Sequence, residues 1–146
     1  MTEGQISLLL EDICARLPYS VKCKYYDCCE GDYDEGTICG FEGKILIQID
    51  GVCIPTEEVK PYLLPLSSMT EEQFNELRNY CNCEINGWAL ENVKLTKEYH
   101  TLEFWVEIVP SYNIIKLLDW LNKNYFDYRG LIDEDLAIDA TDKNIY

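Results

Sequence analysis

Apolar residues at helical spacing begin the chain. In residues 5–17 they recur at intervals of three and four, which places them on one face of an amphipathic helix: Ile6, Leu9, Leu10, Ile13 and Leu17. Pro18 follows, and proline disfavours a helical conformation of the residue before it. The pattern therefore predicts an N-terminal helix that ends at this proline.

Between residues 20 and 55 the period of the pattern shortens to two. Alternation is clearest in residues 20–26 and in residues 44–50, where Ile45, Ile47 and Ile49 share one face, and GVCIP at 51–55 is a further short run. Residues 27–36, DCCEGDYDEG, are expected to form an acidic, turn-rich loop. Short strands at this spacing predict a small, curved antiparallel sheet, of which an SH3-like barrel is one form.

The stretch KPYLLPLSSMTEEQ, residues 60–73, joins the two halves of the chain. Pro61 and Pro65 exclude a regular helix across residues 60–66. Thr70 and Gln73 then have the spacing of a capping box, which predicts that a helix begins here. The apolar residues between the prolines are expected to pack back on the sheet.

The C-terminal half mixes both periods. Residues 93–99 and 101–109 are predicted to form a hairpin with His100 at its tip, and residues 111–126 to form a helix. The remaining residues are expected to lie on the surface as short turns. The pattern predicts one α+β domain over residues 1–146. Its N-terminal part, 1–66, would hold a helix and a small sheet, and its C-terminal part, 67–146, helices and a hairpin.

Charge limits the partners of this chain. It has 12 basic and 27 acidic residues, a net charge of −15. Like charge repels phosphates, so direct binding to nucleic acid or to an anionic membrane is disfavoured. The acidity is explained by solubility, or by a surface that attracts a basic protein, with mimicry of nucleic acid as a special case.

Eight cysteines raise the question of disulfides or metal. The N-terminus lacks the basic region of a secretory signal, and no apolar run approaches the ~20 residues that cross a bilayer, so we expect a cytoplasmic protein with reduced thiols. Cys81-Asn82-Cys83 and Cys23 with Cys28-Cys29 only weakly approximate zinc-site spacing. We therefore expect no bound metal, although the Cys28-Cys29 pair is exposed enough to oxidise.

Catalytic motifs are missing from the sequence. The single histidine, His100, has no nucleophile motif beside it, and residues 27–36 fail the EF-hand pattern. No glycine-rich phosphate loop occurs, so no cofactor is expected. The sequence favours a non-enzymatic protein. A small carboxylate-using enzyme, which would need a concave pocket with paired acids, and a thiol–metal protein remain the alternatives.

Tyrosine is over-represented, with 11 residues. Its ring is a favoured contact in protein interfaces, and tyrosines flank the acidic segment 27–36. The alternative is that these rings only cover a small sheet. The residues predicted to contact a protein partner combine the two features: Tyr26, Asp32, Tyr33, Asp34 and Glu35.

Three stretches resemble a family of small uncharacterised proteins encoded by bacteriophages and mobile elements of gut anaerobes. They are DICARLPYSVKC (12–23), KPYLLPLSSMTEEQ (60–73) and DWLNKNYFDYRGLIDEDLAIDAT (119–141). The resemblance carries no activity and no functional residues. It implies an accessory protein that works inside a bacterial host, and it implies that residues 60–73 are a structural joint rather than a docking peptide.

Overall fold

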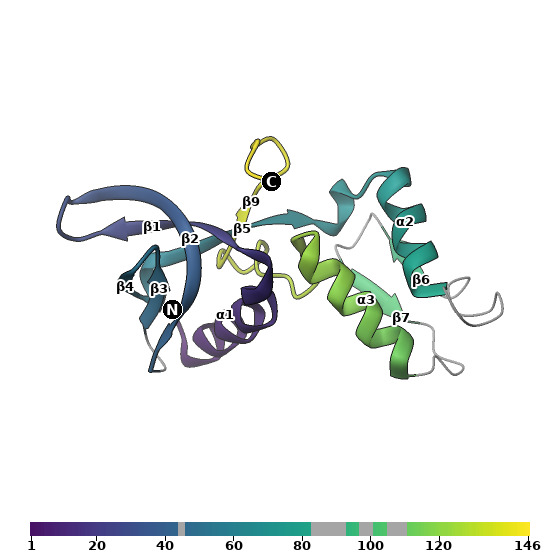
Figure 1. The fold of residues 1–146 in the computed structure, drawn as a ribbon, viewed down its shortest axis with the longest axis horizontal. Coiled ribbons are helices and arrows are strands. Elements are labelled where there is room, and N and C mark those ends of the chain that lie inside the picture. The colour runs from purple at the N-terminus through teal and green to yellow at the C-terminus, as the bar shows by residue number, and fades with distance from the viewer. Residues whose placement is uncertain (44–45, 83–92, 97–100, 105–110) are drawn as a thin grey trace. The chain divides into compact units, whose positions relative to one another are not determined.

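The structure is a computed structural model that describes residues 1–43, 46–82, 93–96, 101–104 and 111–146 (Figure 1). The chain divides into two compact units. Unit 1 contains residues 1–63 and 131–146, and unit 2 contains residues 64–130. The α+β class is confirmed, whereas one domain over the whole chain stays a prediction.

Unit 1 begins with helix α1, Glu3–Arg16, followed by the short helix η1, Leu17–Tyr19. The side chain of Thr2 accepts a hydrogen bond from Gln5 N, and the Gln5 side chain accepts one from Thr2 N, which forms a capping box. Leu9 and Ile13 are fully buried, as the amphipathic pattern predicts. The predicted N-terminal helix and its end before Pro18 are therefore confirmed.

In the described part of the chain, seven strands form one mixed sheet in the order β4-β3-β2-β1-β5-β8, with β9 also paired to β5. The first five strands are antiparallel neighbours; an antiparallel sheet was predicted for residues 20–55, whereas β5 was not predicted to be a strand. They are β1 (Lys22–Asp27), β2 (Asp32–Glu42), β3 (Leu46–Ile49), β4 (Val52–Pro55) and β5 (Val59–Pro65), with η2 (Thr56–Glu58) before β5.

The sheet does not close into a barrel, so the SH3-like form is wrong. Closure would require β4 to pair with β5. The partners of β5 other than β1 are instead two short parallel strands, β9 (Ile138–Asp139) in unit 1 and β8 (Phe126–Asp127) in unit 2. Strand β9 and Asp127 come from the segment that was predicted to be surface turns, and Phe126 comes from the end of the predicted helix 111–126.

Strand β2 changes partner half-way along its length. It pairs with β1 over residues 32–37 and with β3 from Ile38 to Glu42. Gly36 lies at this change, where a Cβ atom would be 2.5 Å from Ile49 Cγ2 and 2.7 Å from Asp50 Oδ2. The loop predicted over residues 27–36 is wrong in extent: only residues 28–31 form the turn, because the acids of β2 are in register with β1.

Strand β5 contains both prolines of the stretch 60–73. Tyr62 and Leu63 are buried, so this apolar segment lies within the sheet rather than packing on top of it. The short helix η3, Leu66–Ser68, follows directly. The absence of a regular helix across 60–66 is confirmed.

Unit 2 contains α2 (Glu71–Asn82), the paired strands β6 (Val93–Thr96) and β7 (Thr101–Phe104), and α3 (Ser111–Lys123). The Thr70–Gln73 capping box is confirmed, as is the hairpin pairing, while His100 lies outside the described residues. Within the described ranges, no helix combines the length and apolar character needed to cross a bilayer. The core of this unit is formed by Leu66, Met69, Leu77, Cys81, Leu117, Trp120, Leu121 and Phe126.

A buried ion pair lies on α1. Arg16 Nε donates to Asp12 Oδ2 at 2.7 Å and Arg16 Nη2 donates to Asp12 Oδ1 at 2.9 Å, and both side chains are fully buried. Two parallel hydrogen bonds of this kind fix the geometry of both side chains. Because both charges are removed from water, each one depends on keeping its neutralising contacts.

Breaking this pair should strongly destabilise the protein. Arg16→Met should lower the free energy of unfolding by about 3–5 kcal/mol, because Asp12 then loses its buried counter-charge. The double variant Asp12→Leu/Arg16→Met should lose less than the sum of the two single variants. Urea unfolding measures both effects, with Ser7→Ala on the same helix as control. Additive losses would contradict the coupling.

Gly36→Ala should also destabilise the protein, by about 1–3 kcal/mol, because the new methyl group must displace Ile49 and Asp50. Gly4→Ala is the matched control, since a Cβ at Gly4 on α1 meets no atom within 4 Å. Thermal or urea unfolding of the two variants should separate them. Equal stability would show that β2 does not need the close approach.

Candidate functional site: the β1–β2 hairpin

The far end of the β1–β2 hairpin is a two-stranded ribbon. Strand β1 pairs with β5 only from Cys23 to Tyr25, and β2 pairs with β3 only from Ile38 onward. Figure 1 shows the hairpin extending beyond the other strands of unit 1. We call residues 26–35 the hairpin arm. It contains all five residues that the sequence predicted to contact a partner.

One face of the arm is aromatic. Tyr26 and Tyr33 lie directly opposite each other, with ring centroids 5.4 Å apart in an edge-to-face arrangement. Lys24 Nζ lies 4.8 Å from the centroid of the Tyr33 ring. These two contacts hold the Tyr33 side chain in place, although 62% of its surface remains exposed. Tyr33 is therefore a positioned, accessible aromatic group.

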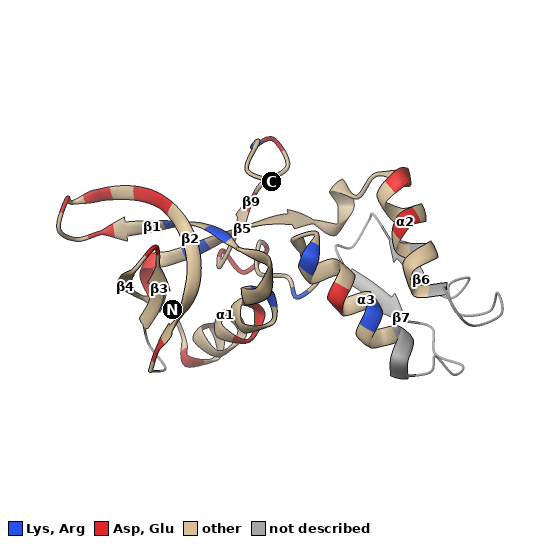
Figure 2. Cartoon of the chain, in the orientation of Figure 1, with Lys and Arg blue, Asp and Glu red and all other residues tan. Residues whose placement is uncertain are grey.

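The opposite face of the arm is acidic. Because residues of a strand alternate between faces, Asp32 and Asp34 share this face with Asp27 of β1. Asp32 Oδ1 accepts from Tyr33 N and Asp34 Oδ1 accepts from Glu35 N, both at 2.7 Å, which fixes the carboxylates. Tyr25 OH donates to Asp34 Oδ2 at 3.3 Å, and the pKa of Tyr25 is raised by burial and by this carboxylate. Figure 2 shows the acids along the hairpin in red.

Glu35 differs from the other four predicted contact residues because its side chain, although exposed, bonds to a strand outside the hairpin. Its Oε1 accepts a hydrogen bond of 2.5 Å from the hydroxyl of Tyr62 on β5. The pKa of Tyr62 is raised above its ordinary value, first by burial and then by this carboxylate. Within the arm, the structure therefore separates Glu35, which bonds to β5, from Tyr26, Asp32, Tyr33 and Asp34.

The base of the hairpin borders a cavity of about 320 Å³. It holds two carboxylates, from Glu35 and Asp50, and Asp50 Oδ2 accepts a hydrogen bond from Thr37 N at 2.9 Å. Burial raises the pKa of the Cys23 thiol at this cavity to about 12, so the thiol is protonated at neutral pH. Sequence reasoning missed Asp50 and Tyr62 because they are remote from Glu35 along the chain. The cavity is lined by Lys22, Cys23, Glu35, Gly36, Asp50, Tyr62, Asn144 and Ile145.

Tyr146 connects the two strands beside this cavity. Its hydroxyl accepts a hydrogen bond from Lys22 N at 3.2 Å and donates one to Tyr62 O at 2.8 Å. These two backbone groups belong to β1 and β5, next to the end of their direct pairing. A side-chain hydroxyl thus continues the connection between the strands where the backbone ladder stops.

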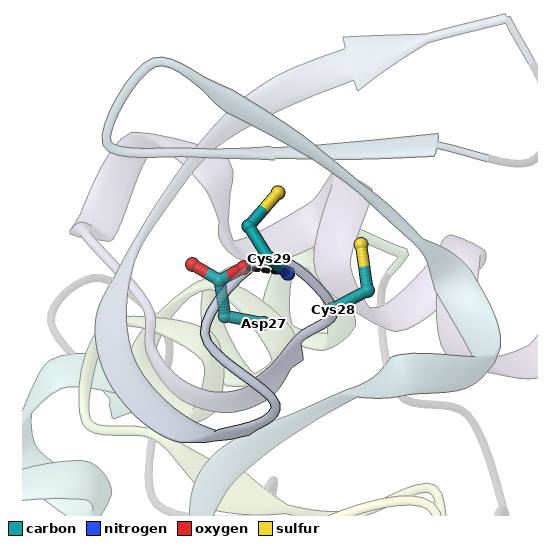
Figure 3. Close-up of side chains that lie close together, drawn as sticks. All are labelled: Asp27, Cys28 and Cys29. Atoms are coloured by element: carbon teal, nitrogen blue, oxygen red, sulfur yellow. Dashed lines mark hydrogen bonds between the residues drawn. The ribbon is translucent and has the colours of Figure 1, made fainter.

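The turn of the arm brings together two thiols and a carboxylate. Ligand atoms of Asp27, Cys28 and Cys29 lie within 4.8 Å of one another, and no other such group of histidine, cysteine or acidic residues occurs in the described ranges (Figure 3). Both thiols are exposed. The pKa of the Cys29 thiol is raised, first by Cys28 and then by Asp27. The adjacent cysteines are visible in the sequence, but their approach to Asp27 depends on the turn.

No protein-family model matches the sequence, and comparisons with curated proteins and with solved structures found no significant match. The resemblance to proteins of bacteriophages and mobile elements therefore stays a prediction. Function has to be argued from the hairpin and its surroundings.

The hydrogen bond between Glu35 and Tyr62 gives a pH prediction. In the folded protein Tyr62 should ionise only at pH values above the ordinary tyrosine pKa of about 10, so its contribution to stability is present at neutral pH and is lost as alkaline pH is reached. Glu35→Gln should lower the pKa of Tyr62, although burial still keeps it raised.

The measurement is tyrosinate absorbance against pH, taken as the difference between each protein and its Tyr62→Phe counterpart. Glu58→Gln, an exposed substitution on η2, is the charge-matched control and should leave the titration unchanged. Identical difference curves for the parent protein and Glu35→Gln would show that the carboxylate does not act on Tyr62.

Proposed function

We propose that this protein is a non-enzymatic binding protein whose hairpin arm docks on a basic surface of a protein partner. The observation that carries the proposal is the combination on one projecting ribbon of an exposed, positioned Tyr33 with the fixed carboxylates of Asp32 and Asp34. Tyrosine supplies contact area at low cost in side-chain entropy, and aromatic residues are enriched in interfaces.

Electrostatics supports a basic partner. The net charge of −15 attracts a cationic protein at long range, and the acids of the arm concentrate negative charge at the point of contact. Such attraction acts mainly on the association rate, and it weakens as salt screens exposed charges. Binding through the arm should therefore be salt-dependent.

The distribution of acids favours local docking over mimicry of nucleic acid. A mimic would need its acids in a continuous double row on one face. In unit 1, acids lie on α1, on the arm, on η2 and in residues 131–146 (Figure 2). Direct nucleic-acid binding is not part of the proposal, because the acidic surface repels phosphates.

A carboxylate-using enzyme is the alternative, and the cavity at the base of the hairpin is where it would act. Both of its carboxylates accept hydrogen bonds from the scaffold, Glu35 from Tyr62 and Asp50 from Thr37. This use of both acids supports a structural role, because each helps to hold neighbouring strands together. The cavity therefore supports the non-enzymatic proposal better than the enzymatic one.

The biological context is also a proposal. It rests on the three stretches that resemble proteins of bacteriophages and mobile elements, and it places this protein among accessory proteins that act in a bacterial cell. Each of these stretches contains strand residues that belong to β5 or pair with it.

A defined cationic probe tests the arm. In ¹⁵N NMR spectra, a short oligo-arginine peptide should shift the amides of residues 27–35 more than those of the rest of unit 1. Asp32→Asn/Asp34→Asn should weaken binding about threefold to tenfold, or roughly 0.3–0.7 kcal/mol per charge, as for exposed ion pairs. Asparagine retains the Oδ1 acceptors, so the hairpin should keep its geometry.

Asp133→Asn/Glu134→Gln is the matched control, since it removes the same charge from exposed residues of unit 1. Equal weakening by this control would reduce the effect to net charge and contradict docking by the arm. A capture experiment from bacterial lysate then uses Tyr33→Ala. If every retained protein is unaffected by Tyr33→Ala and by Asp32→Asn/Asp34→Asn, the proposal is wrong.

A further inference from the structure

The turn of the hairpin arm brings two thiols, which are soft metal ligands, and one carboxylate, which is a hard ligand, within 4.8 Å of one another. Figure 3 shows the Cys28 and Cys29 thiols directed to the same side of the turn, with the Asp27 carboxylate beside them. We propose that Asp27, Cys28 and Cys29 form a binding site for a thiophilic divalent cation of the Zn²⁺ and Cd²⁺ class. The argument for this site does not rest on the proposed docking function, although both lie on the hairpin arm.

The distances suit such an ion after a small movement. Zinc binds sulfur at about 2.3 Å and carboxylate oxygen at about 2.0–2.2 Å, so tetrahedral ligand atoms lie roughly 3.3–3.8 Å apart. The ligand atoms here lie within 4.8 Å of one another. The ligand atoms would have to approach one another by about 1 Å to reach the tetrahedral separation. Rotation of the two cysteine side chains can achieve this, because both are exposed.

The backbone of the turn is already organised for the site. Asp27 O accepts from Gly31 N at 2.8 Å, and Gly31 has a φ of 71°, a conformation that glycine adopts without strain. Asp27 Oδ1 accepts from Cys29 N, also at 2.8 Å, which holds the carboxylate against the turn. Hydrogen bonds of this kind orient metal ligands and strengthen binding.

The charges explain both the attraction and its pH dependence. Asp27 and the neighbouring acids of the arm attract a cation to the turn. On binding, two S–H bonds break, two metal–sulfur bonds form and two protons pass to solvent, with no change of oxidation state. Affinity should therefore increase with pH, because protons compete with the ion.

Ligand type selects the ion. Ca²⁺ takes six to eight oxygen ligands and Mg²⁺ strongly prefers oxygen, whereas two thiolates favour Zn²⁺ or Cd²⁺. Three protein ligands leave the fourth tetrahedral position to water, as in open zinc sites. The turn therefore fits a thiophilic ion and not the hard cations that an acidic surface would otherwise attract.

Cadmium titration of the reduced, full-length protein tests the site. One equivalent of Cd²⁺ should produce a sulfur-to-metal charge-transfer band and release about two protons in weak buffer. The ¹¹³Cd resonance should lie between those of all-oxygen and all-sulfur sites. Cys28→Ser and Cys29→Ser should each weaken binding at least about tenfold, with folding checked by circular dichroism.

Two further variants make the test specific. Asp27→Asn keeps the Oδ1 acceptor for Cys29 N but removes the charge, and it should weaken Cd²⁺ binding about tenfold. Cys39→Ser, an exposed cysteine of β2, is the matched control and should bind as the parent protein does. A band that persists in Cys28→Ser/Cys29→Ser, or that disappears in Cys39→Ser, would overturn the proposal. So would unchanged binding by Asp27→Asn, or a parent protein that binds no Cd²⁺.

Discussion

Backbone pairing between β1 and β5 ends at Tyr25. The candidate site depends on this end, because the hairpin arm begins at the next residue. Beyond it, the two strands of the hairpin have only each other, and a two-stranded ribbon is marginal in water without side-chain support. The edge-to-face contact of Tyr26 with Tyr33 and the cation over the Tyr33 ring supply that support. The same lack of further strands leaves residues 28–35 exposed, so the end of the β1–β5 pairing accounts for the exposure of this part of the arm.

Strand β5 pairs with three other strands of the sheet. It pairs with β1 on residues 59–61, with β9 on Tyr62 and Leu63, and with β8 on Leu64 and Pro65. Its prolines are compatible with these pairings because the parallel contacts are short and the antiparallel contact covers three residues. A strand with such short pairings needs additional connections, and the Glu35–Tyr62 hydrogen bond and the Tyr146 bridge supply them within unit 1.

Local chemistry was visible in the sequence, and long-range pairing was not. The N-terminal helix, predicted over residues 5–17, the Thr70–Gln73 capping box and the short strands between residues 20 and 55 follow from periodicity and from residues close together along the chain. The predicted barrel was wrong because closure depends on which strand pairs with β5. The strands that do so, β8 and β9, have two residues each, which is too short for a hydrophobic period to be detected. The arm was partly predicted. Its tyrosines and acids were identified in the sequence, but the acids were assigned to a loop because residues 27–36 are rich in acids and glycine. The alternation that places Asp32 and Asp34 on one face of a strand was not recognised.

The acids of the arm have different roles because the pleat separates them. Asp27, Asp32 and Asp34 share a face, so their repulsion is concentrated there, and a bound cation or a basic partner would relieve it. Glu35 lies on the other face, where its carboxylate accepts a hydrogen bond from the hydroxyl of the buried Tyr62. Glu35 therefore connects the hairpin to β5, whereas Asp27, Asp32 and Asp34 accept hydrogen bonds from residues of the hairpin itself. On this ribbon, register alone decides which acid belongs to each class, so a one-residue shift of β2 would exchange Asp34 and Glu35 and remove both the aromatic and the acidic face.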